Sequence, residues 1–143
     1  MKKLNSEEES RYVLDTSAFF AYFDDEDGAD TIQNLFEKSK NREIKIFASF
    51  VSYMEVFYIT YHDEDEESAK CRIDLMDELA INRIDSNQEL GLLAGRVKAN
   101  YKLSFADAWI AATAIEFDAI LVHKDPEFLE LKNRIKMLEL PYK

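Results

Sequence analysis

The chain has 143 residues, of which 47% are hydrophobic and 33% are charged, and this balance fits one folded domain rather than a disordered chain. Its net charge of −11 argues against unspecific binding to nucleic acids. A metal-dependent enzyme acting on phosphates stays open, because such sites are themselves built from carboxylates. No apolar run reaches the length of a membrane span, and the single cysteine, Cys71, excludes an intrachain disulfide and a multi-cysteine zinc site.

Residues 1–11 form a polar start of the chain. Two lysines stand there without an apolar segment behind them, so a secretory signal is not indicated. We expect a frayed extension over residues 1–11, one domain over residues 12–143, and a cytoplasmic protein without a membrane partner.

Short apolar runs alternate with segments of helical periodicity along the rest of the chain. In the first half we expect a strand over 12–14, helices over 18–23 and 29–40, a strand over 44–48, and a helix that begins at Ser49 or Ser52. In the second half we expect a helix over 69–79, a weak strand over 81–85, helices from Ser86 and Ser104, a strand over 119–122, a helix from Asp125, and an edge strand over 135–138. This alternation predicts an α/β fold, with a parallel sheet covered by helices on both faces.

Four acids stand where predicted strands pass into helices. Asp15 and Asp125 follow the carboxyl ends of strands, and Glu55 and Asp107 lie in the first turns of helices that leave the same edge. In open α/β sheets this edge binds ligands. Each acid can also be explained as part of a helix cap. Asp125 precedes a proline, and both Glu55 and Asp107 follow a serine at capping-box spacing.

Convergence of the four acids would have a chemical consequence. Two carboxylates about 5 Å apart repel by roughly 3 kcal/mol at an effective dielectric constant of about 20. Such a cluster needs protons or a divalent cation, and an all-oxygen ligand set favours Mg²⁺ or Mn²⁺ over zinc. A phosphatase with an aspartyl nucleophile is disfavoured, because the residue two positions after Asp15 is Ser17 rather than an acid.

Four stretches of the chain together resemble the PIN domain family. They are Leu14–Ser17, the helix start with Glu55, the block Leu103–Ala114, and Leu121–Asp125. The block around Asp107 is the most specific of the four. The resemblance spans nearly the whole chain, and the size is similar to that of VapC-type toxins, which are single-domain members of toxin–antitoxin pairs.

The resemblance implies an α/β/α sandwich with a central, mostly parallel sheet. It also implies an Mg²⁺- or Mn²⁺-dependent endoribonuclease that hydrolyses RNA with a metal-activated water, forms a homodimer, and is inhibited by an antitoxin protein. The family's acidic positions carry over onto Asp15, Glu55, Asp107 and Asp125, with Glu55 acting directly or through a water. The alternative is an inactive PIN-like binding module that keeps the acids for a cation or a protein partner.

One position departs from the family pattern. Members usually have Thr or Ser two residues before the last acid, where this chain has His123. This histidine can bond to the Asp125 carboxylate, reach a water, or lie at the strand end in a structural role, which is the interpretation we favour. Four residues are expected to support the acids: Thr16, Ser17, Ser104 and His123.

A basic segment precedes Asp107. Between residues 90 and 106, Arg96, Lys98 and Lys102 occur with no acid among them. Lys98 and Lys102 share a helix face if that helix continues, and the three side chains are candidates for contacts with RNA phosphates or for a solvated helix end.

Aromatic residues concentrate in two of the expected helices, and we expect them to supply both core and an interface. They are Phe19, Phe20, Tyr22, Phe23, Tyr53, Phe57, Tyr58 and Tyr61.

Overall fold

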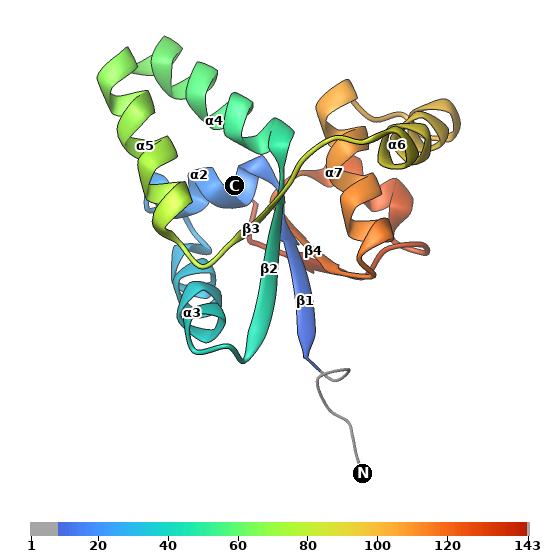
Figure 1. The fold of residues 1–143 in the computed structure, drawn as a ribbon, viewed down its shortest axis with the longest axis horizontal. Coiled ribbons are helices and arrows are strands. Elements are labelled where there is room, and N and C mark those ends of the chain that lie inside the picture. The colour runs from blue at the N-terminus through green and yellow to red at the C-terminus, as the bar shows by residue number, and fades with distance from the viewer. Residues whose placement is uncertain (1–8, 143) are drawn as a thin grey trace.

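The computed structural model describes residues 9–142, and Figure 1 shows a central sheet between two groups of helices. The sheet has five parallel strands in the order β3-β2-β1-β4-β5. The strands are β1 (Ser10–Leu14), β2 (Ile44–Ser49), β3 (Asn82–Ile84), β4 (Ile120–His123) and β5 (Met137–Glu139). The helices are α2 (Thr16–Phe23), α3 (Ala29–Lys40), α4 (Phe50–Asp63), α5 (Glu66–Glu78), α6 (Gln88–Asn100), α7 (Phe105–Glu116) and the 3₁₀ helix η1 (Pro126–Leu131). The expected α/β/α sandwich is confirmed.

The sheet divides the core into two layers, because successive side chains of a strand point to opposite faces. Val13 lies beside Phe47 and Leu121 in the register and packs against α6, α7 and η1. Leu14 lies beside Val122 and packs against α2, α3 and α4. Strands that are apolar on both faces are therefore covered on both faces, as the wholly apolar run at residues 119–122 predicts.

Helices α4 and α5 form an antiparallel pair that extends past the sheet (Figure 1). Arg72 of α5 ties this pair to α2, since its Nη2 lies 2.7 Å from Oδ1 of Asp24 and its guanidinium lies 5.0 Å from the ring centre of Phe23. The side chain of Arg72 is largely buried, whereas that of Asp24 is 43% exposed, so the ion pair lies at the surface above the aromatic contact. Within residues 9–142, no helix combines the length and the apolar character that crossing a bilayer requires.

Several element boundaries differ from those expected. Strand β1 begins at Ser10, inside the polar extension expected over residues 1–11, and residues 1–8 lie outside the described part of the chain. Helix α6 is capped by Asn87, whose side chain accepts a hydrogen bond from the Leu90 amide at 2.9 Å. The helix start expected at Ser86 is therefore wrong by one residue. Asparagine at the next position satisfies the free amide instead.

Candidate active site

Asp15 lies at the centre of the sheet's carboxyl edge. It follows β1, caps α2, and is only 3% exposed. Its Oδ2 accepts hydrogen bonds from the backbone amide of Ser17 at 3.0 Å and from the Ser17 hydroxyl. Strand β1 has β2 on one side and β4 on the other, so the chain reverses its winding direction here. Ligand sites of open α/β sheets form at such points.

Ser17 connects the ends of two neighbouring strands. Its Oγ accepts a hydrogen bond from the backbone amide of Lys124 at 2.9 Å while its hydroxyl proton goes to Asp15. The ammonium group of Lys124 lies 3.1 Å from Oε1 of Glu26, in the connection between α2 and α3. These bonds hold Asp15 at a fixed place relative to the end of β4.

Glu55 is held by a residue from another helix. Thr16 Oγ1 lies 2.6 Å from Oε1 of Glu55 and 3.0 Å from Oγ of Ser52. A hydroxyl has one proton, so Thr16 donates to the carboxylate and accepts from the Ser52 hydroxyl. The first-turn position and the capping box expected for Glu55 are wrong. Helix α4 is capped by Ser49, which places Glu55 in the second turn and leaves Ser52 fully buried.

Asp107 lies in the first turn of α7, as expected. Ser104 caps the helix, and its Oγ accepts a hydrogen bond from the Asp107 amide at 3.2 Å. Burial, and to a smaller extent the negative charges of Asp15, Asp125 and Glu55, together raise the pKa of Asp107 to about 7 against a lowering contribution from the hydrogen bond with Ser104. The Asp107 carboxyl group therefore interacts electrostatically with all three of the other predicted acids.

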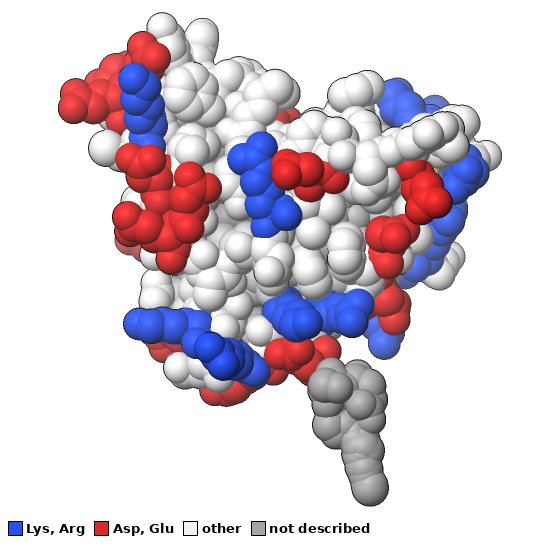
Figure 2. All heavy atoms as spheres, viewed as in Figure 1, with Lys and Arg blue, Asp and Glu red and all other residues white. Residues whose placement is uncertain are grey.

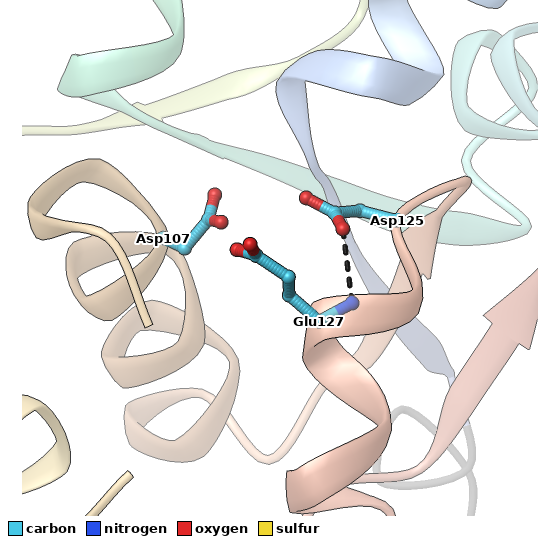
Figure 3. A group of neighbouring side chains, drawn as sticks. All are labelled: Asp107, Asp125 and Glu127. Carbon is cyan, nitrogen blue, oxygen red and sulfur yellow. Dashed lines mark hydrogen bonds between the residues drawn. The ribbon is translucent and has the colours of Figure 1, made fainter. Parts of the chain in front are cut away.

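Asp125 is the fourth acid of the site, and Glu127, two residues later, is a fifth acid at the same place. Asp125 caps η1, and its Oδ1 accepts a hydrogen bond from the Glu127 amide at 2.9 Å. Carboxylate oxygens of Asp107, Asp125 and Glu127 all lie within 4.8 Å of one another, and Figure 3 shows the three side chains converging from α7 and η1. Sequence reasoning missed Glu127. The available signal was its place in the first turn of a helix that begins with Asp125 and a proline.

The acids fit a divalent cation. The pKa of Asp15 is raised to about 6, mainly by burial and in smaller part by the charges of Glu55 and Asp125, while its hydrogen bonds with Ser17 lower it. Raised pKa values mean that the folded chain resists gathering this much negative charge without a positive partner. Carboxylate oxygens are the hard ligands that Mg²⁺ and Mn²⁺ prefer, so the donor set suits either ion.

His123 is fully buried at the end of β4. Its Nδ1 accepts a hydrogen bond from the Asp125 backbone amide at 3.0 Å, and its ring packs against Phe128 with the centres 5.2 Å apart. Burial lowers the pKa of the imidazole, which favours the neutral form. A serine or threonine hydroxyl at this position can accept the same i+2 amide, so the histidine replaces the usual residue as a backbone acceptor.

Arg96, Lys98 and Lys102 are all exposed. Helix α6 ends at Asn100, so Lys102 lies in the connection to α7. The helix face that Lys98 and Lys102 were expected to share does not exist. Both lysines nevertheless line one hollow together with Ser104 and Glu127.

A model of the PIN domain matches residues 12–133 of the chain. The chain belongs to the PIN domain family. No curated protein matches it in sequence. Among solved structures, this PIN domain is similar to VapBC2 from Rickettsia felis bound to a promoter DNA fragment, with a TM-score of 0.74 and 19% identity over 92% of this chain and 99% of the other.

Two further solved structures have the same fold as this PIN domain. DNA-bound VapBC from Salmonella typhimurium gives a TM-score of 0.72 and 15% identity, covering 91% of this chain and 98% of the other. VapC20 from Mycobacterium tuberculosis, a toxin that cleaves the sarcin–ricin loop, gives a TM-score of 0.67 and 15% identity, covering 83% of this chain and 93% of the other. At these identities the likeness establishes a shared fold over nearly the whole length.

Proposed function

We propose that this PIN domain is an Mg²⁺- or Mn²⁺-dependent endoribonuclease and the toxin of a toxin–antitoxin pair. One observation carries the proposal. The carboxylates of Asp107, Asp125 and Glu127 lie within 4.8 Å of one another at the carboxyl edge of a PIN domain, and Asp15 is near enough to raise the pKa of Asp107. A divalent ion held there supplies positive charge, which lowers the pKa of a water and offsets the charge on the phosphoryl oxygens.

Each acid has a role in this proposal. Asp15, Asp107 and Asp125 hold the ion, and Glu127 adds a further carboxylate on the side of η1. Glu55 has one oxygen bound by Thr16, so its other oxygen can accept a hydrogen bond from the attacking water and orient it.

Hydrolysis proceeds by direct attack of water on the RNA phosphodiester, without a covalent enzyme intermediate. Ser17 is a poor nucleophile, since its proton is donated to Asp15 and its oxygen accepts from Lys124. Cys71 lies exposed on α5, away from the acids. With neither side chain available, a water is the attacking group that remains near the acids.

The exposed aromatic side chains of α4 provide a surface for a protein partner. Of the eight aromatic residues expected to serve core and interface, Phe19 and Tyr53 are buried, whereas Tyr58 is 53% and Tyr61 is 50% exposed. Met54, which is 60% exposed, extends this apolar stripe along α4. We propose that the stripe contacts an antitoxin or a second copy of the chain, since apolar surface of this kind marks protein interfaces. Complexes of the VapBC type among the similar structures support the antitoxin.

The test is to incubate the purified protein with total RNA and Mg²⁺ and to sequence the new RNA ends. We expect discrete ends with the wild-type protein, and none with a chelator or with Asp107→Asn. Asp74→Asn on α5 is the matched control, because Asp74 is exposed and distant in sequence from the five acids.

Two results would favour the alternative, a binding module without activity. They are an absence of new ends with the wild-type protein, and equal cleavage by wild type and Asp107→Asn. A titration with Mn²⁺ then tells whether the acids bind a cation at all.

A further inference from the structure

Phe105 is exposed to an unusual degree for an aromatic residue. It is the first residue of α7, and 72% of its surface is accessible, the largest value among the large hydrophobic side chains of the described residues. Burying such a ring stabilises a protein by roughly 2 kcal/mol, a gain that this position leaves unused. Phe105 and Asp107 both lie in the first turn of α7, at the end of the helix that reaches the acid-bearing edge of the sheet, although side chains two positions apart leave a helix in different directions.

Two fixed aromatic residues continue the surface that begins at Phe105. Trp109 follows one turn later on the same face of α7, and its ring meets that of Phe50 edge-on, with the centres 5.0 Å apart. Trp109 is also held by α6, where a Cβ added to Gly91 would lie 3.3 Å from its ring. Phe50 is the first residue of α4, so α4 and α7 both begin at the edge that carries the acids.

A hollow of about 700 Å³ lies beside the acids. It is lined by the end of α6, the connection to α7 and Glu127, and Lys98 and Lys102 are among its lining residues. Neither lysine forms an ion pair with another residue of the described range 9–142. Their charges are thus available to a phosphate, and Glu127 connects the hollow to the group formed with Asp107 and Asp125.

The distribution of charged side chains also favours binding of a polyanion on the side of α6. Acidic side chains gather over α5 in Figure 2, whereas basic side chains line the side of α6. In a chain of net charge −11, a nucleic acid approaches where the local charge is positive.

We propose that Phe105 selects the substrate by stacking on an unpaired base of the RNA, next to the bond that is cleaved. Lys98 and Lys102 hold the neighbouring phosphate in the hollow, and the pair Phe50–Trp109 supports the strand beyond Phe105. Stacking needs a base whose face is free, so the site takes loops and single strands, and it favours purines because their rings are larger. The inference rests on the proposed ribonuclease function and adds which nucleotide is recognised.

The test compares two RNA substrates that contain the mapped cleavage site. One is unmodified, and the other has an abasic residue in place of the nucleotide next to the cleaved bond. The nucleotides on the two sides of this bond are replaced in separate experiments. We expect the missing base to lower kcat/KM of the wild-type protein about 5- to 150-fold, the range that corresponds to loss of one stacked base. Phe105→Ala should cleave both substrates at nearly the same reduced rate, and Phe105→Tyr should behave like the wild type.

Leu92→Ala is the matched control, since Leu92 is a 57% exposed apolar residue on α6 that lines no part of the hollow. It should keep the wild-type preference for the intact base. The proposal is overturned if the abasic residue costs the wild type and Phe105→Ala equally. A change of sedimentation in Phe105→Ala would also overturn it, because the ring would then be buried between two copies.

A failure of the proposed function is distinguishable from a failure of this inference. If the wild-type protein cleaves no RNA, binding of a short fluorescent oligoadenylate is measured by anisotropy with wild type and Phe105→Ala. Weaker binding by the variant supports base stacking even without cleavage, and equal binding refutes it.

Discussion

Replacing Asp107 with asparagine should make the metal-free protein more stable. The pKa of Asp107 rises from 3.8 to about 7 in the folded chain. At about 1.4 kcal/mol per pKa unit, the ionised form costs the folded state about 4 kcal/mol relative to the unfolded chain. Asparagine avoids the charge but still buries a polar group. We therefore expect a gain of about 2–4 kcal/mol in the free energy of unfolding at pH about 8 with a chelator.

The pH dependence has a defined sign. Because its pKa is raised, the folded wild type holds a proton on Asp107 between pH about 4 and about 7 that the unfolded chain has released. The stability of the wild type therefore falls as pH rises through this window, and Asp15 adds a loss of the same sign below pH about 6. Asp107→Asn lacks this pH-dependent loss from Asp107, so its gain in stability over the wild type should shrink as the pH falls to about 4.

Denaturant unfolding followed by circular dichroism measures these differences, with Asp74→Asn as the control for loss of one exposed acid. Adding Mn²⁺ should stabilise the wild type by about 2.7 kcal/mol at a hundredfold excess over Kd and should leave Asp107→Asn nearly unchanged. If Asp107→Asn is less stable than the wild type at pH about 8 with a chelator, burial and the neighbouring acids do not disfavour the ionised form of Asp107 as argued.

Two further predictions concern residues around the metal site. Glu127→Gln should weaken Mn²⁺ binding at least about tenfold in a calorimetric titration, whereas Glu89→Gln, another exposed first-turn acid, should not, and equal affinities would remove Glu127 from the site. His123→Thr should be about 1–3 kcal/mol more stable than His123→Val and should cleave RNA faster, because threonine keeps an acceptor for the Asp125 amide. Equal stability and cleavage of these two variants of similar shape would show that the acceptor is unimportant.

Much of the fold follows from local sequence patterns. The apolar runs that become β1, β2 and β4 and the periodic segments between them predict a parallel sheet with helices on both faces, and the sheet is present. Local rules also place two acids correctly. Ser104 caps the helix of Asp107, and Asp125 caps η1, because each cap involves residues only two or three positions apart.

Other features depended on packing between distant segments. Ser49 and Ser52 are equal candidates for the cap of α4 in the sequence, and only the packing of α2 against α4 decides between them. Ser52 is buried against Thr16, and the same contact fixes Glu55 at 2.6 Å from the threonine hydroxyl. The convergence of Asp107 with Glu127 likewise depends on how α7 and η1 meet at the sheet edge. Such contacts join residues far apart in the chain, so they depend on the relative placement of whole elements, which local capping and periodicity do not encode.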